Sequence, residues 1–257
     1  MPFEKALISY QTIIRKEMTR MLRVWTQTLL PPAITMSLYF VIFGTFIGSQ
    51  VPDVAGFTYM QFIVPGLVMM SVITASYQQT VSGFYFAKFQ RSIEEILVSP
   101  TPSSVVIAGF VTAGVLRGVV VGVIVLILSL FFTSLHVTNV FLVMLFVVLT
   151  AIVFSLAGLL NALYAKNFDQ IAIVPTFVLT PLTYLGGVFY SIFLLPDFWQ
   201  IISRFNPVLY MVNGFRFGFL GISDVNVWGS FVILAVLILV FLIVLLSMFK
   251  RGAGLRN

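Results

Sequence analysis

The residues best suited to chemistry are charged, and they gather in the stretch 85–104, between two long apolar runs. Lys88, Arg91, Glu94 and Glu95 all lie there, in a chain that has only 14 basic and 8 acidic residues. Carboxylates and cations at such close spacing form ion pairs with a complementary surface. The stretch is therefore a candidate docking site for a partner. The alternative is an ordinary polar loop.

The same stretch carries the signals of a short amphipathic helix. Ser92 and Glu95 have the spacing of a capping box, which predicts a helix start at Ser92. Pro100 ends that helix, because the residue before a proline is disfavoured in the helical conformation. Thr101 and Pro102 predict the next helix, with the proline in its first position. Apolar residues at helical spacing share one face of the short helix: Ile93, Ile96 and Leu97.

Composition excludes several kinds of chemistry. The chain has no cysteine and one histidine, His136, so it cannot build a thiolate metal site, a His-based metal site or a histidine triad of its own. The dipeptide Gly-Lys does not occur, so there is no P-loop to bind ATP. We expect no catalytic residue, no metal site and no cofactor in this chain. Energy for any uphill transport must come from another subunit.

The elements that position the charged residues are apolar. Hydrophobic residues make up 60% of the chain, charged residues make up 9%, and the mean hydropathy is +1.10. Soluble domains carry about 25% charged residues, and a membrane helix needs about 20 apolar residues. The sequence predicts an all-α polytopic membrane protein, a single domain over residues 1–257, with six transmembrane helices at 27–49, 58–84, 105–135, 139–164, 171–193 and 227–249.

Basic residues predict the orientation. Twelve Lys and Arg lie on the side that holds both termini, whereas only Arg204 and Arg216 lie on the other, so both termini are expected in the cytoplasm. The run 105–135 is too long for one crossing. Placing Arg117 at the inner interface and His136 at the outer one avoids the cost of a charge at the bilayer centre.

Two segments outside the spans are predicted to lie at the membrane surface. Residues 1–26 form a basic amphipathic helix on the face that carries anionic lipid, unless this helix is merely solvated. Residues 194–221 form two short re-entrant helices that dip into the outer leaflet, the second starting at Asn206. Interpreting them as further full spans would break the charge bias. Every acidic residue, Glu17 included, is expected outside the spans, which disfavours an ion-coupled carrier.

Polar side chains within the second and fifth predicted spans are the candidate lining of a substrate path. The alternative for each is hydrogen bonding between helices. Because nothing charged lines the predicted spans, the expected cargo is hydrophobic or amphipathic. Arg216 either meets an anionic group or extends its side chain to the membrane surface. The candidate path residues are Ser71, Thr74, Tyr77, Gln78, Thr180, Thr183 and Tyr184.

Four segments, taken in order, carry a family resemblance: 31–44, which reads PPAITMSLYFVIFG, 91–109, 181–207 and 206–221. The second has an acidic pair, aliphatic residues, a proline and a helix that runs into a glycine. The last combines Asn-Pro with Tyr, Arg and Gly. Over nearly its whole length the chain resembles the ABC-type exporter permeases of the second type.

The resemblance implies a role for each segment. Such permeases are six-span subunits of the bacterial inner membrane that form homodimers and bind two ATP-binding-cassette ATPase subunits, which hold the ATP and magnesium. The segment between the second and third spans is their coupling helix, with the N-terminal helix beside it and residues 166–169 as a minor contact. Carried over, the ATPase-coupling residues are Lys88, Arg91, Ser92, Glu94, Glu95, Leu97 and Pro100, and the outer motif, with a structural role, is Asn206, Pro207, Tyr210, Arg216 and Gly221.

The resemblance and the residues together predict an exporter subunit that works by alternating access and moves a drug, lipid or glycolipid-like cargo. Its expected partners are a second copy, two ATPase subunits and membrane lipid, and no nucleic acid. A non-transporting membrane scaffold that relays ATP hydrolysis to envelope assembly and an ion-coupled carrier are the open alternatives. The aromatic-lined channel of polysaccharide exporters in this family is not identifiable in the sequence.

Overall fold

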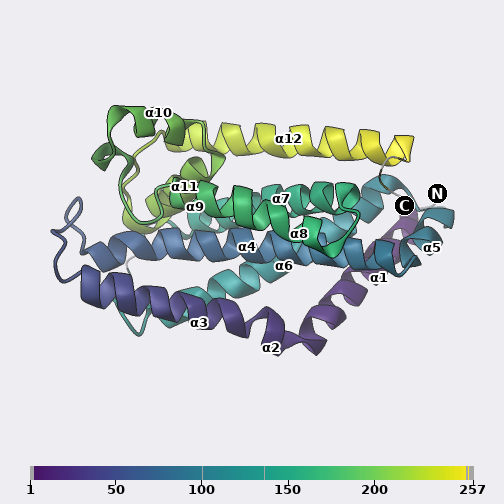
Figure 1. The fold of residues 1–257 in the computed structure, drawn as a ribbon, viewed down its shortest axis with the longest axis horizontal. Helices are drawn as coiled ribbons and strands as arrows, with labels where there is room; N and C mark the ends of the chain where they lie inside the picture. Colours follow the sequence, from purple (N-terminus) through teal and green to yellow (C-terminus); the bar gives the residue numbers. More distant parts are fainter. Residues whose placement is uncertain (1–2, 100, 136, 253, 255–257) are drawn as a thin grey trace.

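The computed structural model is a set of helices that run largely along one axis (Figure 1). It describes residues 3–99, 101–135, 137–252 and 254, with only the backbone of Ile96 and Leu97, and this part contains no β-strand. The start of α1 (Phe3–Arg23), α5 (Ser92–Val98) and the last turn of α12 (Val227–Arg251) lie at one end, which we call the α5 end. The opposite end carries α10 (Asp197–Arg204) and is called the α10 end.

In the described part of the chain, five helical stretches are long and apolar enough to cross a membrane. They correspond to the predicted runs 27–49, 58–84, 105–135, 139–164 and 227–249. The first joins α2 (Trp25–Thr28), α3 (Leu30–Tyr39) and the π-helix η1 (Phe40–Ile47). The third ends at Ser129 rather than at residue 135, which shortens the run. The stretches are Trp25–Ile47, α4 (Tyr59–Phe89), α6 (Ser103–Ser129), α7 (Val140–Tyr164) and α12.

The predicted span 171–193 is not one long helix. Pro175 has no N–H to donate to the carbonyl of Ile171, and that carbonyl instead accepts from Asn161 Nδ2 at 3.3 Å. The chain widens there into a π-helix and turns at Gly187, where φ is +71°. The helical run is therefore shorter than predicted and is made of α8 (Phe168–Val174), η2 (Pro175–Leu179) and α9 (Thr180–Tyr184).

α4 is the central helix, with 78% of its spanning segment buried against 17% for α12. A helix that is hydrophobic on all sides is typical of such a position. On α6, three glycines at four-residue spacing face α4: a Cβ at Gly114 would meet Thr80, one at Gly118 would meet Ser76, and one at Gly122 would meet Val72. Small residues let membrane helices approach closely, so this glycine stripe places α6 directly against α4.

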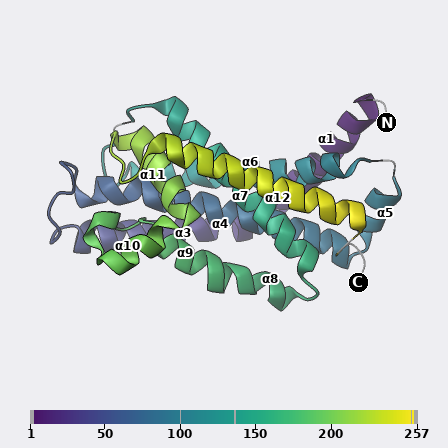
Figure 2. The ribbon, with the colours of Figure 1, turned by 90° about the horizontal axis from the view of Figure 1, so that it is seen from above.

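α1 packs across α6 at the α5 end, as Figures 1 and 2 show. The Tyr10 hydroxyl lies 2.9 Å from Thr112 Oγ1, and a Cβ at Gly109 would meet Ile13. Ile13, Glu17 and Met21 are buried, so this face of α1 packs against the bundle. Phe3, Leu7 and Trp25, by contrast, are exposed.

At the α10 end, η3 (Ile192–Leu194), α10 and α11 (Pro207–Leu220) occupy the segment predicted to hold two short helices. α11 is buried and runs antiparallel to α7, since Gly214 faces Phe146 while Gly218 faces Val143. The backbone N–H of Asn139 donates to Gly218 O at 2.8 Å. α11 thus ends beside the first turn of α7, with α10 at the same end of the molecule (Figure 2).

Candidate functional site

α5, which lies at one end of the molecule (Figure 1), carries an acid pair. Glu94 and Glu95 are exposed in its first turn, and so is Arg91, which precedes it with a left-handed φ of +59°. Ile93 is only 1% exposed and anchors the helix to the bundle. α5 is therefore fixed by one face and offers its charges on the other, as a docking surface requires.

The capping box predicted for α5 is not formed. Arg91, and not Ser92, occupies the cap position, and its side chain makes no cap bond. The Ser92 hydroxyl instead donates to Ala87 O at 3.3 Å and accepts from Lys16 Nζ at 3.4 Å. The helix still begins at Ser92, and Ser99 is extended, as expected before a proline. α6 begins at Ser103, so Pro102 precedes the helix and does not take its first position as predicted. Pro100, His136 and the side chain of Leu97 lie outside the described part of the chain.

Lys88 is buried near the C-terminal end of α4, where it caps α7. Its ammonium donates to Leu163 O at 3.2 Å and to Ala165 O at 3.1 Å. The last carbonyls of a helix have no partner within the helix, and a cation is favourable beside them. Lys88 thus links the ends of α4 and α7 directly behind α5.

An aromatic cluster links the same region to α8. The ring of Phe168 lies 4.9 Å from Tyr85, 5.6 Å from Phe86 and 5.2 Å from Phe89, in edge-on arrangements. Such pairs stabilise packing beyond the area that they bury. Sequence reasoning treated 166–169 only as a minor contact and missed this cluster. An aromatic residue directly after the helix cap Asn167 was the available signal.

A cavity of about 450 Å³, which we call the lateral cavity, opens beside α4. Of the candidate path residues it includes only Gln78; Ser71, Tyr77 and Thr183 are buried in the bundle instead. Tyr77, for example, accepts a 2.7 Å bond from Asn161 Nδ2. The lateral cavity is lined by Gln78, Val81, Ser82, Phe86, Arg117, Phe168, Ile171, Ala172, Pro175 and Thr176.

The other path candidates form local bonds. Thr74 and Thr180 donate to Met70 O and Pro175 O within their own helical runs. The Tyr184 hydroxyl lies 3.3 Å from that of Tyr39, and both rings pack on Phe189. This aromatic group bridges α3 and α9. It was not recognised from the sequence, because its members are far apart along the chain.

Behind the lateral cavity, α1, α4 and α6 share a buried polar cluster. Glu17 accepts from Arg20 Nη2 at 2.7 Å and from Gln79 Nε2 at 3.2 Å. Gln79 Oε1 in turn accepts from Arg117 Nη1 at 3.3 Å, and Arg117 Nη2 donates to Thr28 O at 3.2 Å. The cluster joins α1 to two of the helices that are long enough to span a membrane, α4 and α6.

Glu17 lies outside the candidate spans, as expected, but it is buried, because α1 packs on the bundle and presents Glu17 to Gln79. The expectation that nothing charged lines the spans is wrong, because Arg117 borders the lateral cavity. Its side chain is buried, with 6% exposed.

The outer motif caps and seats α11. Asn206 Oδ1 accepts from the Val208 N–H at 2.9 Å and its amide donates to Leu182 O at 2.6 Å, while Gly221 ends the helix with a φ of +73°. Pro207 takes the first helical position, as predicted. Tyr210 donates to Arg204 O at 2.7 Å. These contacts are structural.

Arg216 does not extend to the membrane surface as one expectation had it. It is fully buried, donates to Gly187 O at 2.6 Å, and its guanidinium carbon lies 3.9 Å from the centre of the Phe62 ring. Asp224, the nearby carboxylate, accepts from Ser191 and from the Ile192 N–H at 2.9 Å each. Arg216 therefore holds the turn after α9 against α4.

We expect Arg216→Met to lower the free energy of unfolding by about 2 kcal/mol, because it removes a charge-assisted hydrogen bond and a cation–π contact. Thermal unfolding in detergent measures the change. Arg204→Met is the matched control, since that arginine is exposed on α10 and should cost less than about 0.5 kcal/mol. Equal losses in the two variants would contradict the role of Arg216.

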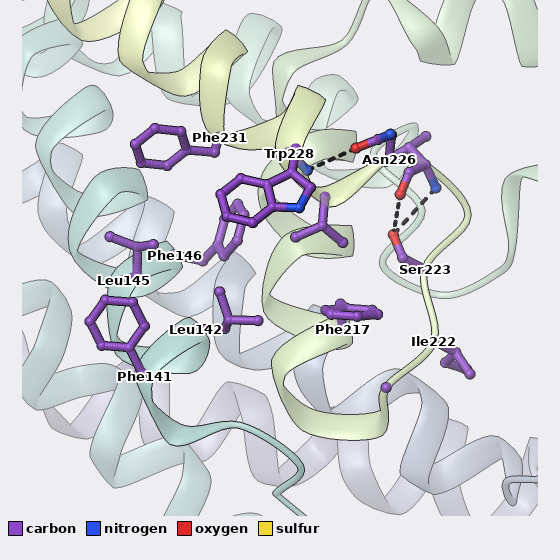
Figure 3. A pocket seen from close by; sticks show the side chains of 13 residues that line it. Phe141, Leu142, Leu145, Phe146, Phe217, Ile222, Ser223, Asn226, Trp228 and Phe231 are labelled. Atoms are coloured by element: carbon purple, nitrogen blue, oxygen red, sulfur yellow. Dashed lines mark hydrogen bonds between the residues drawn. The ribbon is translucent and has the colours of Figure 1, made fainter.

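A second cavity, of about 900 Å³, lies at the α10 end between α7, α11 and α12 (Figure 3). Its walls are mostly apolar, with Phe141, Phe146 and Trp228 around the space. At the edge of this cavity Asn226 caps α12, since its Oδ1 accepts from the backbone N–H of Trp228 at 2.9 Å. Of the predicted site residues only Gly221 lines it. It is therefore separate from the lateral cavity and from α5.

Comparisons with known proteins agree with one another. A family model described as ABC-2 type transporter matches residues 8–220. The inner membrane transport permease YadH of Escherichia coli (strain K12) is 57% identical over 250 residues, which cover 97% of this chain and 98% of that protein. Nodulation protein J of Rhizobium leguminosarum bv. viciae is 23% identical over 215 residues, covering 83% of each chain.

Proposed function

The chain belongs to the ABC-2 type transporter family, and from that premise we propose that it is the membrane-spanning permease subunit of an ATP-driven exporter. Its cargo is hydrophobic or amphipathic. It works as a homodimer with two ATPase subunits, which bind the ATP and magnesium and carry out the hydrolysis. Both termini lie in the cytoplasm. The run from α8 to α9 crosses the inner membrane in addition to the five long helical stretches, which makes six crossings.

The observation that carries this proposal is the exposed acid pair on α5. Glu94 and Glu95 lie at the end of the molecule that also holds the start of α1 and the end of α12. The basic residues predict that this end is cytoplasmic. An ATPase subunit that docks there meets carboxylates on a short helix whose opposite face is anchored in the bundle.

The anchors provide a route for motion. Lys88 ties the end of α4 to the end of α7, and Phe168 ties it to α8. Closure of the ATPases displaces α5, and these contacts pass the displacement to the helices on either side of the lateral cavity. Alternating access requires two packings of these helices with different affinities for the nucleotide-bound ATPase. Lys88 then acts as a positioning residue rather than as a direct contact.

Support for a second copy comes from polar groups on a membrane-facing surface. Gln78 is exposed in the middle of α4, and Thr176 and Thr180 are exposed on the neighbouring helical run. Polar side chains that face lipid are costly, and spanning helices normally turn them toward protein or water. A partner protomer over this face would enclose the lateral cavity and these side chains.

The test is affinity purification of the full chain from native membranes in mild detergent, followed by mass spectrometry. We expect an ATP-binding subunit in a roughly equimolar amount. ATP hydrolysis by that subunit should be stimulated when the permease and a cargo are present. Absence of any ATPase, under several detergents and with or without nucleotide, would sink the exporter proposal.

A further inference from the structure

The buried polar cluster has more positive than negative charge. Arg20 and Arg117 bring two cations, and Glu17 brings one carboxylate. Within the described residues, the carboxylate of Glu17 forms an ion pair with Arg20, whereas Arg117 donates only to the neutral oxygens of Gln79 and Thr28. Arg117 Nε is buried and has no hydrogen-bond partner in this part of the chain. A buried guanidinium without a counter-charge is costly, which points to an anion from outside the chain.

Arg117 borders a space that can receive such an anion. The lateral cavity, about 450 Å³, has the size of small-molecule sites. Its wall combines two kinds of surface. Polar side chains come from Gln78, Ser82 and Thr176, on the same wall as Arg117, while Phe86, Phe168 and Ala172 are among the apolar ones. The cavity therefore suits a molecule with a charged head and an apolar body.

We propose that the lateral cavity binds an amphipathic molecule with an anionic head, a phosphate or a carboxylate, and that Arg117 is the residue that pairs with this head. This inference rests on the proposed function and names its substrate class. The head lies against Arg117 and the polar wall, and the acyl or other apolar part lies along Phe86 and α8.

The surroundings favour an anionic ligand. Beside the cluster, α1 carries a groove of about 570 Å³ lined by Arg15, Lys16, Arg20 and Arg23. Such a basic surface attracts anionic amphiphiles to the nearby leaflet and raises their local concentration. Among the described residues, those that line the groove and the lateral cavity include no acidic one. Selection against cationic amphiphiles follows from the same charge arrangement.

The test is direct binding to the purified full-length permease in uncharged detergent, by calorimetry and by thermal shift. The ligands are dioctanoyl phosphatidic acid, the uncharged dioctanoylglycerol and free glycerol 3-phosphate. We expect saturable binding of the phosphatidic acid only. Arg117→Gln should weaken it by about tenfold or more, the effect of losing one charge-assisted hydrogen bond, and Arg117→Lys by less.

A second variant keeps the test decisive if Arg117→Gln fails to fold. Ala172→Trp fills the lateral cavity from an exposed position on α8 and leaves the charge cluster intact, so it should also abolish binding. Ile173→Trp, next to it and outside the cavity lining, is the matched control for bulk, and Arg204→Gln, on the exposed surface of α10 at the opposite end of the molecule, is the control for charge. Both controls should bind as the unmodified protein does.

Three results would overturn the proposal: equal binding of dioctanoylglycerol, full binding by free glycerol 3-phosphate, which would indicate a plain anion site, or phosphatidic acid binding that survives Ala172→Trp. Because the assay uses the permease alone, its outcome is independent of whether an ATPase copurifies. Failure of the binding test and failure of the exporter proposal are therefore distinguishable.

Discussion

Replacing the acid pair of α5 by Glu94→Lys with Glu95→Lys should weaken association with the ATPase subunit by at least about tenfold and reduce its stimulated hydrolysis to a similar degree. Both carboxylates are exposed, and within the described part of the chain neither forms an ion pair. Reversal replaces two attractive charges by two repulsive ones at the proposed interface. Co-purification and ATPase assays on the reconstituted complex measure the effect.

The matched control moves the same charge change to the opposite end of the molecule. Asp53 and Asp197 are exposed acids at the α10 end, so Asp53→Lys with Asp197→Lys alters the net charge equally. That variant should keep full association. Stimulation that is unchanged in the α5 variant, with normal membrane insertion of both proteins, would place the docking contact elsewhere.

Gly66→Ala should destabilise the fold by about 3 kcal/mol, at the upper end of the cost of overpacking. A Cβ at this position would lie 2.5 Å from Val188 O and 2.8 Å from Val188 Cα, and backbone atoms cannot rotate away as a side chain can. α4 would have to separate from the turn after α9. That separation would also strain the bonds from Tyr59 to Phe189 O and from Arg216 to Gly187 O.

Gly229→Ala provides the comparison for Gly66→Ala. Gly229 lies in the first turn of α12, where an added Cβ would meet only Asn226 at 3.8 Å. Alanine is favoured over glycine in a helix by up to about 1 kcal/mol, so this variant should be neutral or slightly more stable. Unfolding in mixed micelles distinguishes the two. A Gly66→Ala protein as stable as the Gly229→Ala protein would show that the turn can move away from α4.

The prolines after α7 explain why one predicted span was too long. A hydropathy average over 171–193 is high, but Pro175 removes a backbone donor and Gly187 requires a left-handed turn. The proline signal was visible in the sequence. It could not show where the helix would resume or which side chain would donate a hydrogen bond to the unpaired carbonyl of Ile171. Asn161, on α7, donates that bond.

The capping box at Ser92 failed for a related reason. Local spacing predicted that its hydroxyl would cap α5, and the helix does begin there. The hydroxyl instead donates to Ala87 O of α4 and accepts a hydrogen bond from Lys16 of α1. These two bonds, one of them to a residue far away along the chain, replace the bond that the local motif predicts. The glycine stripe on α6, in contrast, was readable from the sequence as small residues four apart and was overlooked.

By itself, the sequence determined the membrane class, the positions of five spanning helices, the exposed acid pair between α4 and α6, and the ends of α11. Each of these depends on hydropathy, charge or helix-end chemistry within a short segment, which local residues decide. Only the tertiary structure decided the partners of the buried charges. Lys88 caps α7, Glu17 and Arg20 join α1 to α4, and Arg117 borders the lateral cavity. A buried charge is satisfied by whatever groups the packed helices bring to it, and these lie far away along the chain.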